Sequence, residues 1–223
     1  MTTSEKRLWD KTAALLGNSQ VSFDGHWSFN FRNDPKRLGF VLSRYKFSAK
    51  MACQKGSVLE LGCGFGIGAP ILAERAEKYV GIDLDEPAVL AAQRTFPADK
   101  YEFVYDDFMG KEYGKFDAVI SLDVAEHILP EFQAIYFDTI FKNMKEDGIC
   151  VIGTPNITSS PYASECSKMG HVNMFSQERL VSVMKGYFHQ VFPFGMNDEI
   201  AHTGYAPMAH YLMCVGCHKR ESK

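Results

Sequence analysis

A glycine-rich run near residue 60 has the residue types of a loop that holds a ligand. The run LELGCGFG at residues 59–66 follows a short apolar stretch, Ser57–Leu61, and precedes a segment with helical spacing, Ile67–Lys78. Glycine lets the backbone turn sharply and approach a ligand closely. The start of a helix offers free N–H donors. A tight strand-to-helix turn also favours glycine for its own sake, so the run alone does not name a ligand.

An acidic residue after the next apolar stretch narrows the chemistry of that ligand. Asp83 directly follows the strand-like segment Tyr79–Ile82. A carboxylate about 20 residues after a glycine loop is placed to bind the ribose hydroxyls of an adenosine group. Asp83 also suits a helix cap ahead of Pro87, and the two roles are compatible.

Two features favour a cationic ligand over a dinucleotide. The third glycine of the G-x-G-x-x-G fingerprint would fall at position 67, which is Ile67. Glu60 stands two residues before the first glycine, where its carboxylate would repel a diphosphate but suit a positive charge. We therefore expect an adenosine-containing cofactor that carries positive charge.

A third group of polar residues, Asp123, Glu126 and His127, follows the apolar segment Phe116–Leu122. Ligands of open α/β sheets bind outside the carboxyl ends of the strands, so these side chains are expected beside the reacting atoms. His127 suits a general base, because its ordinary pKa lies near neutrality. The three residues could instead gather a divalent ion, or Glu126 and His127 could only cap and orient the following helix. We place the base or structural interpretation ahead of the metal.

These residues require strands that alternate with helices, and the sequence has that order from Ser57 onward. Such alternation predicts parallel βαβ units. Two late strand-like runs without a helix between them are expected to be antiparallel. The expected strands are 57–61, 79–82, 101–104, 116–122, 149–153, 190–193 and 210–215, and the expected helices are 67–78, 87–96, 130–145 (closed by Gly148) and 177–185.

The first 55 residues differ from the rest, being rich in aromatic and charged side chains. We expect a cap of one or two helices at residues 1–55, with a loop at 18–35, and one globular catalytic unit at 56–223. Residues that could cover the cofactor, by a cation–π contact or by packing, are Trp27, Phe29, Arg32, Arg44 and Tyr45.

In this order and spacing, the motifs resemble those of class I S-adenosylmethionine-dependent methyltransferases over roughly residues 55–195. The run at 58–66 is similar to the family's E/DxGxGxG motif, and Lys145–Ile149 to its turn into the fifth strand. Asp106-Asp107-Phe108, after the third strand, resembles the family's segment that holds the adenine. The resemblance implies a Rossmann-like, mostly parallel sheet of seven strands, with an antiparallel last strand and helices on both faces. It also implies S-adenosylmethionine as the cofactor. The cofactor-binding residues that it implies are Glu60, Gly62, Cys63, Gly64, Gly66, Asp83, Leu84, Asp106, Asp107, Phe108 and Leu122.

The metal alternative is also supported by a resemblance. The Asp123-x-x-Glu126-His127 segment is similar to one in ubiquinone-pathway O-methyltransferases and in small-RNA terminal 2′-O-methyltransferases, where it helps hold a metal. In the RNA group a later histidine completes the site, and His171 could fill that place. Mg²⁺, Mn²⁺ or Zn²⁺ would suit such mixed oxygen and nitrogen ligands. The segment 155–175 resembles the acceptor pocket of enzymes that methylate sugars and other small metabolites.

Composition sets limits on the partners and the compartment. The 223 residues carry a net charge of −3 and a pI of about 6.2, which argues against a nucleic-acid partner. There is no apolar run long enough to span a membrane and no signal-peptide core at the N-terminus. The six cysteines are expected to be reduced thiols, and Cys214 and Cys217 have no second pair to complete a zinc site. We therefore expect a cytoplasmic protein, while its oligomeric state stays open.

Together these observations predict methyl transfer from S-adenosylmethionine to a hydroxyl of a small polar metabolite or sugar. Amine and carboxylate acceptors stay open, because a fold does not fix chemistry. The alternatives are a metal-assisted RNA 2′-O-methyltransferase, a nucleotide-dependent oxidoreductase, and a binding module that keeps the fold without catalysis.

Overall fold

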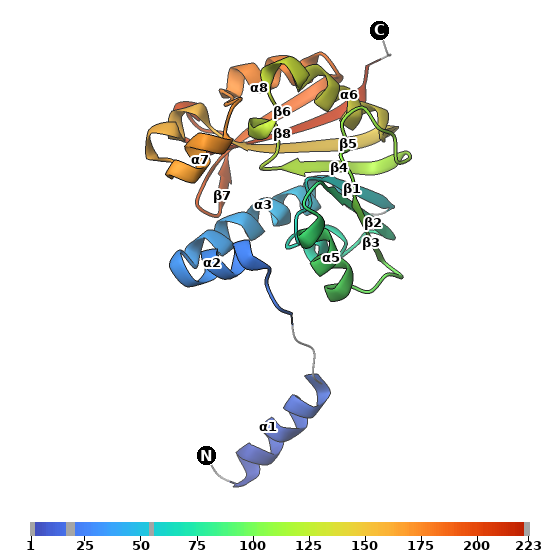
Figure 1. The fold of residues 1–223 in the computed structure, drawn as a ribbon, viewed down its shortest axis with the longest axis vertical. Helices are drawn as coiled ribbons and strands as arrows, with labels where there is room; N and C mark the ends of the chain where they lie inside the picture. The colour runs from blue at the N-terminus through green and yellow to red at the C-terminus, as the bar shows by residue number, and fades with distance from the viewer. Residues whose placement is uncertain (1–2, 17–20, 54–55, 221–223) are drawn as a thin grey trace.

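A computed structural model describes residues 3–16, 21–53 and 56–220, and its centre is one eight-stranded sheet (Figure 1). The strand order is β3-β2-β1-β4-β5-β8-β6-β7. The first five strands pair in parallel, and β8 pairs antiparallel with both β5 and β6. The strands are β1 (Ser57–Leu61), β2 (Lys78–Asp83), β3 (Tyr101–Tyr105), β4 (Phe116–Leu122), β5 (Met144–Pro155), β6 (Phe188–Asn197), β7 (Ile200–His202) and β8 (Tyr211–Lys219).

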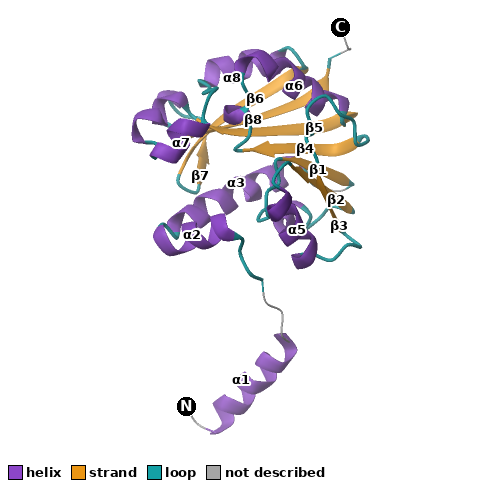
Figure 2. Cartoon of the chain, viewed as in Figure 1, coloured by secondary structure: helices purple, strands orange, loops and turns teal. Residues whose placement is uncertain are grey.

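Helices cover both faces of this sheet, as Figure 2 shows. The helices are α1 (Thr3–Leu16), α2 (Gly25–Asn33), α3 (Lys36–Ala52), α4 (Ala69–Leu72), α5 (Glu86–Thr95), α6 (Gln133–Lys142), α7 (Glu165–Gly170) and α8 (Gln177–Lys185). Short 3₁₀ turns lie at η1 (Ala125–His127), η2 (Pro130–Phe132), η3 (Ile157–Tyr162) and η4 (Ala206–Met208). No helix in the described part of the chain has both the length and the apolar character that crossing a membrane requires.

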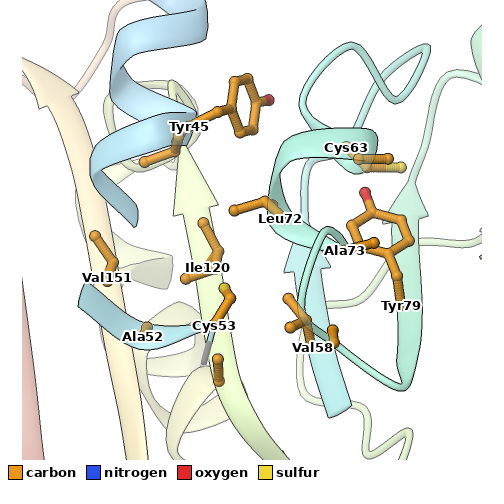
Figure 3. Packing of buried hydrophobic residues seen from close by; sticks show 14 of the residues in the cluster. Tyr45, Ala52, Cys53, Val58, Cys63, Leu72, Ala73, Tyr79, Ile120 and Val151 are labelled. Carbon is orange, nitrogen blue, oxygen red and sulfur yellow. The ribbon is translucent and has the colours of Figure 1, made fainter. Parts of the chain in front are cut away.

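The core has two halves because neighbouring residues of a strand point to opposite faces. On one face, α3, α4 and α5 pack against side chains such as Val58, Ile120 and Val151 (Figure 3). On the other face, α6 and α8 pack against Leu59, Val119 and their neighbours. The central strands are buried on both faces, which explains why they are continuously apolar in the sequence.

The fold expected from the sequence is confirmed, with one more strand than the seven predicted. The extra strand, β7, lies inside the stretch interpreted as a polar loop and forms a hairpin with the end of β6. Asp198 takes a left-handed φ of 51° in the connecting turn, a conformation that Asp tolerates better than most side chains. The predicted antiparallel pairing of the last two long strands is also confirmed.

Three predicted helix boundaries were wrong. The loop predicted at 18–35 contains α2, which begins where the Asp24 side chain accepts a hydrogen bond from the Trp27 N–H. The helix predicted at 67–78 is only α4. At the start of β2, the N–H groups of Glu77 and Lys78 instead donate to the carbonyl of Gly56, which precedes β1. The expected boundary at residue 55 lies outside the described residues.

The third error concerns the helix predicted at 130–145. It opens as the 3₁₀ turn η2, α6 ends at Lys142, and β5 already begins at Met144, ahead of Gly148. The Asn143 side chain donates to the carbonyls of Thr139 and Lys111 and accepts from the Tyr113 N–H. These bonds satisfy the helix end through tertiary contacts, which local periodicity does not report.

Candidate functional site

A cavity of about 660 Å³ lies over the carboxyl ends of the parallel strands. Its walls come from α2 and α3, the loop after β1, the end of β2, the turn after β4, the segment 155–174 and the start of β8. This is the edge of an open α/β sheet at which ligands bind. The molecule therefore brings the predicted glycine loop, the predicted ribose-binding residue Asp83 and the two histidines to a single cavity.

The glycine loop needs glycine for backbone reasons. Gly62, Gly64 and Gly66 have φ angles of 82°, 50° and 77°, which side chains with a Cβ rarely adopt. A Cβ on Gly62 would lie 2.2 Å from Cγ2 of Val124, so this loop packs directly against the turn after β4. Gly66 turns away from the cavity and meets the ring of Phe103 instead.

Asp83 ends β2 beside this loop, at the position predicted for a ribose-binding residue. The Gly64 N–H donates to its Oδ2 at 2.6 Å, and the Asp85 N–H donates to its Oδ1 at 2.9 Å. Each carboxylate oxygen keeps capacity for a second donor. The neighbouring Leu84 side chain is exposed and does not reach the cavity wall.

Glu60 differs from the expectation that its carboxylate faces the cofactor. It is fully buried beneath the loop and absent from the cavity wall. The Tyr45 hydroxyl donates to its Oε1 at 2.8 Å, and the Tyr79 hydroxyl donates to its Oε2. Burial raises the pKa of Glu60 to about 7, against the lowering effect of the two phenol hydrogen bonds. Glu60 thus joins α3 and β2 under the loop; Figure 3 shows both tyrosines within this packed cluster.

The segment after β3, expected to hold adenine, lies beside the cavity rather than on its wall. The Asp106 carboxylate accepts from Lys111 Nζ and from the Tyr113 hydroxyl, and these bonds lower its pKa. The Asp107 carboxylate accepts from the Met109 N–H. Phe108 is buried in the core. A role for these residues at adenine stays a prediction.

Glu126, His127 and His171 come together as predicted. One ligand atom from each lies within 4.8 Å of the others, and the two imidazole rings meet edge to face at 5.0 Å. The Nδ1 of His127 lies 2.9 Å from the Gly170 carbonyl. Since a carbonyl only accepts, Nδ1 carries the proton and Nε2 is the free basic nitrogen. Burial, and then His127, lower the pKa of His171, so this ring stays neutral more readily.

Glu126 has one satisfied and one unsatisfied carboxyl oxygen. The Thr154 hydroxyl donates to its Oε2 at 2.9 Å, but among the described residues no donor reaches its buried Oε1. Burial, and then the charge of Asp123, raise the pKa of Glu126 to about 8. A buried carboxyl oxygen without a donor fits a site that is completed by a cation or a ligand.

Asp123, which was expected among the metal ligands, lies outside that cluster. Its carboxylate instead pairs with Arg44 Nη1, at 3.1 Å and 3.0 Å to its two oxygens. The sequence grouped Asp123 with Glu126 and His127 by spacing alone, and it could not show that a cation on α3 would reach it.

The cap contributes more to the cavity than the sequence indicated. Trp27, Arg44 and Tyr45 lie on the wall as predicted, whereas Phe29 and Arg32 do not. The sequence reasoning missed Arg37, which lies on the wall one heptad before Arg44 on α3. The spacing of seven places both arginines on one helix face, and that signal was available.

Comparisons with known proteins agree with this arrangement. A family model described as a methyltransferase domain matches residues 35–187. A ubiquinone biosynthesis O-methyltransferase of Psychrobacter arcticus is 28% identical over 161 residues, covering 69% of this chain and 61% of that protein. A probable S-adenosylmethionine-dependent methyltransferase of Mycolicibacterium smegmatis is 31% identical over 110 residues, covering 49% of this chain and 42% of that protein. The chain thus spans less than two thirds of the length of either relative.

The fold is also similar to that of solved structures. The N-methyltransferase NodS of Bradyrhizobium japonicum, in complex with S-adenosyl-L-homocysteine, superposes with a TM-score of 0.63 at 19% identity. The match covers 89% of this chain and 94% of that one. At this identity the likeness establishes the fold and leaves the acceptor open, since NodS is named for nitrogen rather than oxygen methylation.

Proposed function

The chain belongs to the methyltransferase domain family, in the S-adenosylmethionine-dependent class, and from this premise we propose that it methylates a hydroxyl of a small polar molecule. One observation carries the proposal. Asp83, at the end of β2, and the free Nε2 of His127, after β4, belong to residues that line the same cavity of about 660 Å³. Cofactor and base would therefore meet in one cavity.

The cofactor half of the cavity suits the groups of S-adenosylmethionine. Asp83 would accept hydrogen bonds from the ribose hydroxyls. The loop leaves room for close backbone approach at Gly64, where an added Cβ would meet no atom within 4 Å. The carboxylate of the methionine part needs a cation. The wall has two arginines, and since Arg44 is paired with Asp123, we assign this role to Arg37.

The other half suits removal of a proton. S-adenosylmethionine, when bound, supplies a methyl group on positively charged sulfur, which an oxygen nucleophile can accept. His127 takes the proton of the acceptor hydroxyl at Nε2, because Nδ1 is committed to the Gly170 carbonyl. This contact also fixes the orientation of the ring. General bases of this kind typically contribute about 10²- to 10⁴-fold to a rate.

A divalent cation is a second candidate component, and the unpartnered Oε1 of Glu126 favours it. Glu126, His127 and His171 would hold the ion, and Asp123 would not. The Nε2 of His127 would then be a ligand, so the ion would replace His127 as the group that eases deprotonation. The ion would polarise the acceptor hydroxyl and ease its deprotonation. The donor set fits Mn²⁺ or Zn²⁺ in its mixture of oxygen and nitrogen.

Two measurements test these assignments in turn. The first is thermal unfolding with S-adenosylhomocysteine, with and without EDTA or Mn²⁺, and with NADH as the control ligand. A ligand that binds the native state raises the unfolding midpoint. We expect a rise with S-adenosylhomocysteine alone and none with NADH. A rise only with NADH would overturn the proposal, and a further rise with Mn²⁺ would support the metal component.

The second measurement compares two probes, 3,4-dihydroxybenzoate and 3,4-diaminobenzoate, as methyl acceptors. We expect methylation of the hydroxyl probe, and a loss of about 100-fold or more in His127→Ala. His189→Ala, which removes an exposed histidine of β6 that does not line the cavity, is the matched control. Methylation of the diamine alone, or of a 3′-terminal RNA ribose alone, would reject a small hydroxyl acceptor.

A further inference from the structure

The Arg44 guanidinium connects three separate parts of the molecule. It projects from α3, its Nη1 lies 3.1 Å and 3.0 Å from the two carboxylate oxygens of Asp123, and its Cζ lies 3.6 Å from the centre of the Tyr211 ring. Only 18% of its side chain is exposed. Arg44 and Asp123 are 79 residues apart in sequence, and Tyr211 begins β8. The contact thus joins the cap to the far half of the sheet.

Asp123 has an unusual backbone at the point where Arg44 holds it. Its φ angle is 56°, in the left-handed region that is unfavourable for residues with a Cβ, although Asp tolerates it better than most. Its N–H donates to the Gly153 carbonyl at 2.9 Å. Strain of this kind persists only where surrounding contacts fix the conformation. The ion pair to Arg44 is such a contact.

The turn at Asp123 sets the position of the residues that follow it. Val124 packs on the glycine loop at Gly62. Glu126 and His127 belong to the 3₁₀ turn η1, and the His127 N–H donates to the Val124 carbonyl at 2.9 Å. A shift at Asp123 would therefore move Glu126 and His127 together relative to the cofactor loop.

Arginine suits this place better than lysine or an apolar residue. Its planar guanidinium can stack on an aromatic ring while pairing with a carboxylate, and lysine cannot do both in the same way. The Asp123 side chain is 39% exposed, and an ion pair that water still reaches adds little net stability. Such a pair is better explained by the conformation that it fixes.

We propose that Arg44 is a positioning residue that holds the Asp123 turn, and with it Glu126 and His127, in place for methyl transfer. The catalytic part of this inference rests on the proposed function. The structural part does not, because the position of the turn can be measured without an acceptor.

The test uses Arg44→Met and Arg44→Lys in the full chain, with Lys46→Met as the matched control. Lys46 is an exposed cation on the same helix, without contact to Asp123. The first readout is hydrogen exchange of the Asp123 and His127 amides. We expect exchange at least tenfold faster in Arg44→Met, a smaller increase in Arg44→Lys, and rates equal to the parent protein in Lys46→Met. Amides of β1 should be unchanged in all three.

The second readout separates kcat from KM with S-adenosylmethionine and 3,4-dihydroxybenzoate. Arg44→Met should lose at least tenfold in kcat, with KM for S-adenosylmethionine within threefold of the parent value, and Arg44→Lys should recover part of the loss. Arg37→Met should instead weaken S-adenosylhomocysteine binding and leave the exchange of the turn unchanged.

The two proposals fail in different ways. Unchanged exchange of the Asp123 and His127 amides in a folded Arg44→Met protein would overturn the positioning role. Faster exchange would support it even if the parent protein methylated no hydroxyl probe, which would reject only the proposed function. If Arg44→Met does not fold, Asp123→Asn removes the same ion pair at the other end, and faster exchange of the His127 amide is then the expected result.

Discussion

Two buried glutamates lie near the carboxyl ends of the neighbouring strands β1 and β4, and they differ in how their carboxyl oxygens are hydrogen-bonded. Both carboxyl oxygens of Glu60 accept hydrogen bonds, from Tyr45 and Tyr79. Only one oxygen of Glu126 does, from Thr154, and the other has no partner in the part of the chain that the structure describes. Burial raises the pKa of both, to about 7 for Glu60 and about 8 for Glu126.

This difference separates a structural acid from one that is open to a ligand. Buried polar groups in folded proteins are generally hydrogen-bonded, and an exception needs a physical reason. Glu60 needs no outside partner, because one tyrosine of the cap and one of β2 complete it. Glu126 lines the cavity, and no described residue donates to its Oε1, so a bound cation or acceptor would complete it. Glu60 therefore supports the glycine loop, whereas Glu126 is available to a bound cation or acceptor.

The largest expected effect comes from making the same substitution, glutamate to glutamine, at both Glu126 and Glu60. Glu126→Gln should lower methyl transfer about 100-fold or more, an effect in the range of acid–base groups, with little change in the unfolding midpoint. Glutamine keeps an oxygen for the Thr154 hydroxyl, so the fold retains that bond. Glu60→Gln should instead cost about 1–3 kcal/mol in stability, because one phenol loses its acceptor, with a smaller loss of turnover. Urea unfolding and initial rates on the same preparations check both.

The reverse pattern would contradict the distinction. If Glu126→Gln unfolded more easily while keeping its turnover, Glu126 would be structural. If Glu60→Gln lost turnover as Glu126→Gln does, with parental stability, then Glu60 would act on the cofactor directly, as the sequence alone suggested.

The second effect tests the contact between the glycine loop after β1 and the turn after β4, where Gly62 meets Val124. Gly62→Ala places a Cβ 2.2 Å from Val124 Cγ2 on a backbone with φ of 82°, whereas Gly64→Ala meets no atom within 4 Å at φ of 50°. Each substitution carries left-handed strain of about 1–3 kcal/mol. Gly62→Ala adds overpacking of about 1–3 kcal/mol. Urea unfolding should show the larger loss for Gly62→Ala, and equal losses would show that the loop and the turn move independently.

The fold was predictable because its signals are local and repeated. Continuous apolar strands, the glycine run and Asp83 all depend on neighbours in sequence, and their order fixed the class of sheet. The helix ends that were wrong depend on distant groups. Asn143 ends α6 through bonds to Lys111 and Tyr113, and no periodicity within α6 contains that information.

The site was predictable to the same extent. Spacing brought Glu126 and His127 together, and the resemblance added His171, which the structure places beside them. The partners of Asp123 and Glu60 were not predictable, because they are distant in sequence. Arg44 of α3 lies 79 residues before Asp123, and Tyr45 of α3 and Tyr79 of β2 lie 15 residues before and 19 residues after Glu60. Whether a carboxylate is already satisfied depends on such tertiary contacts, and that decides its role.

The last expected effect sharpens the comparison through pH. The pKa of Glu60 in the fold is about 7, above its ordinary value of 4.5. A raised pKa favours the protonated carboxyl in the folded state, so the stability from Glu60 is fully present below pH 4.5 and is lost as pH rises through 7. One group of this kind changes the free energy of unfolding by at most about 1.4 kcal/mol per pH unit.

The difference in stability between the parent protein and Glu60→Gln should therefore shrink from pH 4.5 to pH 7. Carboxyls with lowered pKa values, such as Asp117, act equally in both proteins and cancel in the difference. Urea unfolding at half-unit intervals measures it, and a constant difference across that range would mean that Glu60 is ionised in the fold, with its two phenols stabilising the charge.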